Sequence, residues 1–165
     1  MYSFLAKNID KTLNIDKRIL EIIKYINKPL FDNTIKHAAV VQYDANGQVI
    51  ELLMNPDKLK EMTIYEIKFI LCHELMHIIL QHGIILTNTN KKDLRLVLGV
   101  LEICVNDAVI QKCNFDINRL SFWNNLITTE SVFKNKNILH NQSFEYYLHK
   151  TKQLDKNIIE REVII

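Results

Sequence analysis

The sequence is poor in residues that interrupt regular structure, with three glycines and two prolines among 165 residues. It also lacks a strong charge of one sign, since 21 Lys and Arg oppose 19 Asp and Glu for a formal net charge of +2. No short repeat occurs, and 48% of the residues are apolar. These properties exclude a disordered or collagen-like chain and predict a single ordered domain over residues 1–165. The balanced charge gives no indication of a nucleic-acid or membrane partner.

Cysteine is scarce, and its spacing gives no metal-binding or disulfide signature. Cys72, Cys104 and Cys113 form no CxxC motif and leave one thiol over under any pairing, so we expect reduced core residues in a cytoplasmic protein. The first residues have neither the apolar core nor the cleavage site expected of a signal peptide. The most apolar stretch, 64–86, carries side chains that are costly in lipid, namely Glu66, Lys68, His73, Glu74, His77 and His82. It is therefore expected to be a buried helix.

Hydrophobic periodicity predicts an α+β fold that is mainly helical, with a small antiparallel β-hairpin. The predicted helices cover 14–28, 64–81, 93–113 and 143–153, and the predicted hairpin strands cover 39–43 and 48–53 around a turn at Asp44–Gly47. Thr63 and Glu66 form a capping box that begins the second helix. An Asn-rich segment, 114–142, has no periodicity and is predicted to be a long loop. The tail, 158–165, is expected to be a strand or a docking segment.

Residues 73–77 read His-Glu-Leu-Met-His, an HExxH motif in the middle of the predicted helix 64–81. His73 and His77 are four residues apart and lie on one face of that helix, a spacing that lets two imidazoles share a zinc ion. Glu74 lies about 100° round the helix from His73, which suits a carboxylate that contacts a water at the metal instead of the metal itself. Histidines satisfied in an ordinary core are the alternative interpretation. The motif predicts one Zn²⁺ per chain.

A third metal ligand is required, and the sequence offers three candidates. Asp107 lies in an apolar helix that can pack against the HExxH helix, so it is the preferred ligand. His82 follows His73 by nine residues and points about 180° away on a continuous helix, so it could ligate only if the helix breaks near Gln81. Glu102 is the remaining alternative, on a different face from Asp107.

The arrangement resembles a family of HExxH metallopeptidase domains that commonly precede a von Willebrand factor A-like domain. The resemblance covers about residues 14–150. It rests on Asn55-Pro56 after the hairpin, on the HExxH motif followed by His82, on the helix with Asp107, and on Ser143-Phe144-Glu145-Tyr146. It implies a zincin-like α+β domain with His73, His77 and Asp107 at the metal and Glu74 catalytic. The chain departs from the family at Glu102, Ile103, Gln111 and Gly83, and its 165 residues do not include the A-like domain.

These features predict a zinc-dependent peptidase that acts on a peptide or protein substrate, with a metal-activated water and Glu74 as general base. The alternative is a non-catalytic, zinc-stabilised binding or regulatory module, with a protein partner in place of the A-like domain. A metal-dependent hydrolase acting on RNA is a third possibility, but the chain has no basic stripe. An extended peptide could pair with the hairpin edge. The candidate hydrogen-bond donors to the oxyanion are Tyr146, Tyr147, His140 and His82. Three aromatic residues could line a pocket or belong to the core, namely Tyr43, Phe122 and Trp123.

Overall fold

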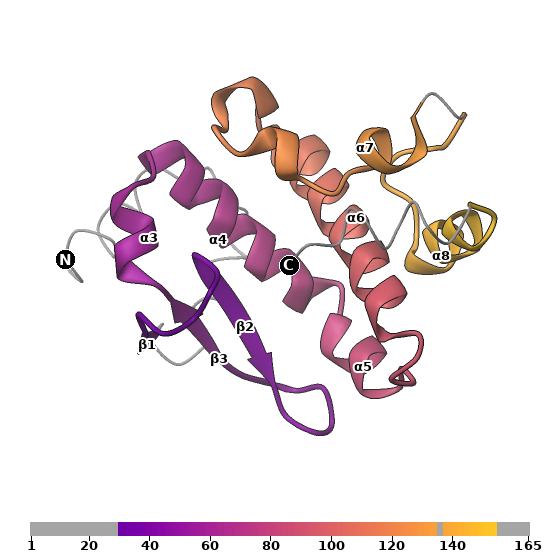
Figure 1. Ribbon diagram of the computed structural model, residues 1–165, viewed down its shortest axis with the longest axis horizontal. Coiled ribbons are helices and arrows are strands. Elements are labelled where there is room, and N and C mark those ends of the chain that lie inside the picture. Colours follow the sequence, from indigo (N-terminus) through magenta and orange to yellow (C-terminus); the bar gives the residue numbers. More distant parts are fainter. Residues whose placement is uncertain (1–29, 135–136, 155–165) are drawn as a thin grey trace.

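The computed structural model describes residues 30–134 and 137–154 and has an α+β fold, as the sequence predicts (Figure 1). Within these ranges, a small mixed sheet accompanies six α-helices and two short 3₁₀ helices. The elements are β1 (Leu30–Phe31), β2 (Ala39–Tyr43), β3 (Val49–Met54), α3 (Pro56–Lys60), α4 (Ile64–Ile79), α5 (His82–Thr87), α6 (Leu94–Lys112), η1 (Ile117–Arg119), η2 (Trp123–Asn125), α7 (Thr129–Phe133) and α8 (Phe144–Lys152). The helix predicted over 14–28 and the tail over 158–165 lie outside the described residues.

The predicted hairpin is present as β2 and β3, which pair antiparallel. Its turn is held by the carboxylate of Asp44, which accepts hydrogen bonds from the backbone N–H groups of Asn46 and Gln48, and Gly47 supplies a positive φ of 79°. β1 adds a parallel strand on the other side of β3. The order of the described strands is therefore β1-β3-β2, which makes β2 an edge strand among them.

Helix α4 begins at the predicted capping box, since the Thr63 hydroxyl accepts from the N–H of Glu66 while the Glu66 carboxylate accepts from the N–H of Thr63. It ends at Ile79, two residues before the predicted end. The reason is local, because Gln81 adopts a left-handed conformation with a φ of 56° and the chain starts again as α5 at His82. The predicted continuous helical path to His82 is thus broken.

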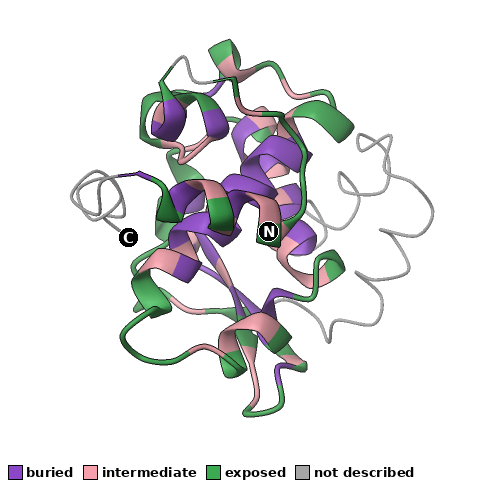
Figure 2. Cartoon of the chain, turned by 90° about the vertical axis from the view of Figure 1, so that its right-hand side faces the viewer, coloured by how far each residue is buried: buried purple, intermediate pink, exposed green. Residues whose placement is uncertain are grey.

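Helix α4 lies between the sheet and α6, and α7 and α8 lie beyond α6 (Figure 1). Buried residues follow the middle of the molecule through these central helices (Figure 2). One apolar cluster joins α4 to the sheet, a second joins α4 to α6, and a third joins α6 to α7 and α8. The segment 114–142, predicted to be a long loop, contains η1, η2 and α7. No helix in 30–134 or 137–154 is long and apolar enough to cross a membrane.

The hairpin turn docks directly on the start of α5. A Cβ atom placed on Gly83 would collide with the carbonyl oxygen of Gly47 and with the ring of Tyr43. Only glycine therefore permits this close approach. The contact fixes the chain at the residue next to His82, which is fully buried.

The buried carboxylate of Glu66 ties the start of α4 to the segment that follows η1. Besides capping α4, it accepts hydrogen bonds from the backbone N–H of Ser121 at 2.8 Å and from the Ser121 hydroxyl at 2.5 Å. The Ser121 hydroxyl is the main cause that lowers the pKa of Glu66 to about 2, with help from the N–H groups of Ser121 and Thr63 and against the effect of burial.

We expect Glu66→Gln to lower the free energy of unfolding by about 1.5–3 kcal/mol at pH 7, because hydrogen bonds to an ionised group are lost. The folded-state pKa lies below the unfolded value of 4.5, so this contribution is complete above pH 4.5 and fades as the pH falls toward about 2. Urea unfolding between pH 7 and pH 3 should therefore show the two proteins converging. Glu61→Gln, at an exposed glutamate, is the matched control. A constant difference across this range would contradict the assignment.

Candidate metal centre

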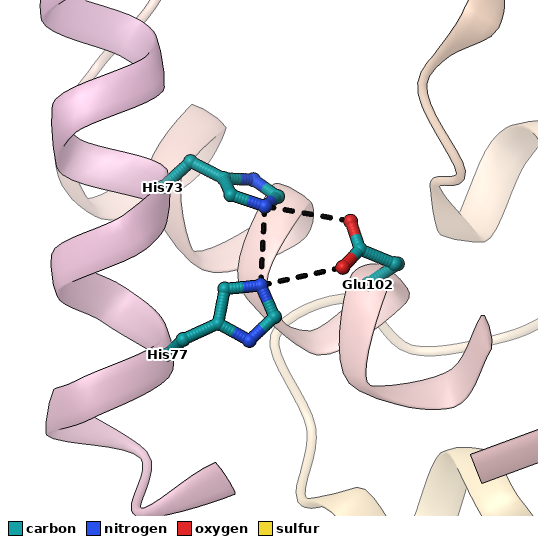
Figure 3. Close-up of side chains that lie close together, drawn as sticks. All are labelled: His73, His77 and Glu102. Atoms are coloured by element: carbon teal, nitrogen blue, oxygen red, sulfur yellow. Dashed lines mark hydrogen bonds and ion pairs between the residues drawn. The ribbon is translucent and has the colours of Figure 1, made fainter. Parts of the chain in front are cut away.

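Three side chains from α4 and α6 converge on one point (Figure 3). The Nε2 atoms of His73 and His77 lie 3.1 Å apart. Glu102 reaches across from α6, with one carboxylate oxygen 3.4 Å from Nε2 of His73 and the other 3.3 Å from Nε2 of His77. One ligand atom from each residue lies within 4.8 Å of the others, so the group could hold a metal ion.

The two helices explain this convergence. His73 and His77 are one turn apart and share a face of α4. Helix α6 runs antiparallel to α4, as two contacts show. The hydroxyl of Tyr65, at the start of α4, accepts a hydrogen bond from the backbone N–H of Asp116, beyond the end of α6. His77, near the end of α4, instead contacts Glu102, which lies in the first half of α6. The apolar contact between the two helices therefore places Glu102 opposite both imidazoles.

Asn106 sets the orientation of His73. Its side-chain nitrogen donates to the backbone carbonyl of Ile127 at 3.0 Å, so its oxygen is the atom that faces Nδ1 of His73 at 2.9 Å. An amide oxygen can only accept, which requires His73 to carry its hydrogen on Nδ1. In the neutral form of His73 with this tautomer, Nε2 carries the lone pair and faces His77 and Glu102.

His82 does the same for His77, through a 2.9 Å contact between the Nδ1 atoms of the two rings. Burial and the neighbouring His77 lower the pKa of His82 to about 3, so His82 is neutral. When His77 is neutral and donates to His82, its hydrogen lies on Nδ1 and its Nε2 carries a lone pair. With both histidines neutral in these tautomers, two lone pairs face the Glu102 carboxylate, an arrangement that a cation would stabilise.

The carboxylate of Glu102 is ionised. Burial raises its pKa, but His73 and His77 outweigh burial and bring the pKa to about 2. For His77, burial lowers the pKa, and the hydrogen bond and charge of Glu102 outweigh that effect, so the pKa is raised. In the absence of another cation, a proton on His77 is what balances Glu102, and a metal ion would compete with that proton.

Glu74 does not belong to the converging group. Its side chain is half-buried, and Oε2 accepts a hydrogen bond from the backbone N–H of Val41 at 3.0 Å. It therefore links the helix that carries both histidines to the edge strand β2. Its negative charge also contributes to the raised pKa of His77.

The structure does not bring Asp107, the preferred third ligand, to the two histidines. Its carboxylate accepts hydrogen bonds from the backbone and the hydroxyl of Thr129 and from the hydroxyl of Tyr147, and lies 3.4 Å from Nδ1 of His140. Asp107 follows Glu102 by five residues and points about 140° round α6, toward α7 and α8. Glu102 occupies the expected place, so the preference for Asp107 over Glu102 is corrected.

The other residues that the sequence singles out lie outside the group formed by His73, His77 and Glu102. His82 is brought back to His77 by the break at Gln81 but lies outside the converging group. Phe122 packs on Phe69 with ring centroids 5.9 Å apart. Trp123 is 43% exposed and lines, with Asp107 and His140, a pocket of about 540 Å³ on the other side of α6. Sequence reasoning missed Asn106, although two polar residues four apart, Glu102 and Asn106, marked one face of an apolar helix.

We expect Asn106→Ala to weaken metal binding by about 10–100-fold, because His73 loses the acceptor that fixes its tautomer. Asn106→Asp retains an acceptor for Nδ1 of His73 and should keep the affinity within a few fold. Equilibrium dialysis with Zn²⁺ as the probe ion measures both variants. Equal losses in the two variants would show that Asn106 acts only through its contact with Ile127.

In comparisons with protein-family models, curated proteins and solved structures, nothing matches this chain.

Proposed function

We propose that the protein is a zinc-dependent peptidase with a zincin-like fold. The observation that carries this proposal is the convergence of His73, His77 and Glu102, with Glu74 beside it on the same helix but not part of it. Two imidazole nitrogens and a carboxylate oxygen are ligands that zinc accepts, and three protein ligands leave a fourth position open for catalysis. A zinc ion held there supplies Lewis acidity and lowers the pKa of water to about 7.

Glu74 is proposed as the general base. Val41 donates to Oε2, and within the described residues no hydrogen bond to Oε1 is present, so Oε1 can accept a proton from an attacking water. Glu74 would then return that proton to the leaving amine. The bond from Val41 limits how far the carboxylate can move during these steps.

The edge strand β2 is the proposed binding element for an extended peptide. Among the described residues, no strand pairs with its outer side in the sheet order β1-β3-β2, and the bond from Val41 to Glu74 places this edge next to the proposed base. A peptide paired with β2 would lie beside the metal-binding residues, and its recognition would depend on backbone hydrogen bonds.

Tyr43 is the strongest candidate for a donor to the oxyanion. Among the described residues, its hydroxyl is the buried side-chain oxygen or nitrogen that has no hydrogen-bond partner. Burial and the nearby negative charge of Glu74 both raise the pKa of Tyr43, so the hydroxyl keeps its proton. The donors predicted from sequence are engaged elsewhere, since Tyr147 and His140 contact Asp107 and His82 contacts His77. The hydroxyl of Tyr146 accepts from Leu139.

A non-catalytic, zinc-stabilised module is the second candidate. The observation that favours it is the bond between Glu74 and Val41, because a carboxylate that only fastens a helix to a strand would need that contact and nothing more.

The metal site is tested first. Glu102→Gln should weaken zinc retention at least about tenfold, because the ion loses its anionic ligand. Asp107→Asn should leave zinc retention unchanged while lowering thermal stability, since its partners are Thr129 and Tyr147. Elemental analysis of the purified proteins and dialysis against Zn²⁺ provide the measurement. No bound transition metal in the wild type, and no affinity for Zn²⁺, would remove the proposal.

Catalysis is tested by Glu74→Gln, which should keep the zinc and reduce hydrolysis of a peptide library by about a hundredfold or more. Mass spectrometry of the digests, at matched zinc occupancy, provides the readout. Glu61→Gln is the exposed control and should keep full activity. Zinc binding without hydrolysis in the wild type would favour the non-catalytic module, and loss of zinc in Glu74→Gln would make Glu74 a ligand.

A further inference from the structure

A pocket of about 540 Å³ lies on the other side of α6 from the metal-binding residues. Its volume falls within the range of about 300–1,000 Å³ that small-molecule sites occupy. The lining residues belong to α6 and to the elements between α6 and α8 (Figure 1). Asp107, which lines the pocket, is turned about 140° round α6 from Glu102. The pocket and the proposed metal centre are therefore separate sites.

Part of the pocket lining is apolar, and it includes an exposed indole ring. Ile110, Ile117 and Leu126 are half-buried, whereas Trp123 is 43% exposed. The backbone of Trp123 is held at both ends of η2, since its N–H donates to the carbonyl of Leu120 at 3.2 Å and its carbonyl accepts from the N–H of Leu126 at 3.1 Å. The pocket thus presents a large aromatic side chain from a fixed backbone position, on which the apolar face of a ligand can pack.

The carboxylate of Asp107 orients a second ring at this pocket, the imidazole of His140. Hydrogen bonds from Thr129 and Tyr147 hold the buried carboxylate in place, and its Oδ2 lies 3.4 Å from Nδ1 of His140. An ionised carboxylate only accepts, so it favours a hydrogen on Nδ1 of His140. The neutral ring then carries its lone pair on Nε2, directed away from Asp107. Since the side chain of His140 is 39% exposed and lines the pocket, it offers a ligand a hydrogen-bond acceptor.

The other polar residues of the lining favour an uncharged ligand. Lys134 lines the pocket together with the carboxylates of Asp107 and Glu130. A single lysine beside two carboxylates is not the cluster of cations that binds phosphate or sulfate groups. Gln111 and Asn124 are exposed and contribute amides, which both donate and accept hydrogen bonds. The lining therefore combines an aromatic face with donors and acceptors on several elements around it.

We propose that this pocket binds the ring of a neutral sugar. The C–H groups on one face of the sugar pack on the indole of Trp123, and its hydroxyl groups bond to Nε2 of His140 and to the amides and the Glu130 carboxylate around the pocket. A sugar fits this lining because its hydroxyls both donate and accept and surround the ring, whereas the polar atoms of a nucleobase lie at its edges in the ring plane. The proposal is independent of the proposed peptidase activity.

The chain carries its own probe for this test, because Trp123 is its only tryptophan. Intrinsic tryptophan fluorescence therefore reports directly on the pocket. The full chain is titrated with glucose, galactose, mannose and N-acetylglucosamine. We expect at least one of these sugars to change the emission in a saturable way, with a Kd on the order of 1 mM, as the binding energy per atom of small ligands implies. The titration requires neither a metal nor peptide hydrolysis, so its failure is distinguishable from a failure of the proposed peptidase.

Variants of the two rings assign the binding to the pocket, with saturation-transfer NMR as the readout that needs no tryptophan. Trp123→Ala removes the aromatic face and should weaken binding about tenfold or more, whereas Trp123→Phe keeps a ring and should stay within a few fold. His140→Ala removes the acceptor and should weaken binding about fivefold. His149→Ala, at an exposed histidine on α8, is the matched control and should bind as the wild type does. Circular dichroism establishes that the variants are folded.

Several outcomes would overturn the proposal. No saturable change with any of the four sugars would remove it. Undiminished binding to Trp123→Ala would mean that the sugar binds elsewhere on the chain. Adenine and glucose 6-phosphate test the class of ligand by the same NMR measurement. Tighter binding of adenine than of every sugar would assign the pocket to a nucleobase, and tighter binding of glucose 6-phosphate than of glucose would contradict the preference for an uncharged ligand.

Discussion

The packing of α4 against α6 is the contact on which the arrangement of this protein depends. It brings Glu102 to the two histidines and places Asn106 behind His73. The same contact puts both helices in the centre of the molecule, with the sheet on one side and α7 and α8 on the other. The apolar contact between the two helices thus brings polar side chains together from both of them, and each of these side chains has a hydrogen-bond or charge partner.

These buried polar groups are stabilised by hydrogen bonds from residues on other secondary-structure elements. The Ile127 carbonyl holds Asn106, and the α5 residue His82, next to the close approach of Gly83 and Gly47, holds His77. On the other side of α6, Asp107 joins Thr129, the first residue of α7, to Tyr147 on α8. Two polar centres on one helix therefore fasten most of the described elements to each other, in addition to the apolar clusters.

The features that the sequence predicts correctly are those that depend only on residues close together in the chain. The capping box at Thr63, the Asn46-Gly47 turn and the shared face of His73 and His77 are local patterns, and the structure has all three. The third member of the metal group depends on how two helices rotate against each other, and helical spacing within α6 does not fix that rotation. Asp107 and Glu102 were therefore not separable by pattern alone. The break at Gln81 was equally hidden, because it rests on a non-glycine residue in a left-handed conformation.

The phase of α6 has a consequence for how such a chain can change in length. Glu102 and Asn106 face one neighbour and Asp107 faces another, so a single inserted or deleted residue between them would turn one set by about 100° relative to the other. The link between His77 and Glu102, in contrast, passes through α5 and the turns near Asn88–Asn90, where extra residues can be absorbed. Distant relatives are therefore best sought by a rigid Glu-x-x-x-Asn-Asp spacing at a variable distance after His-Glu-x-x-His, instead of by overall similarity.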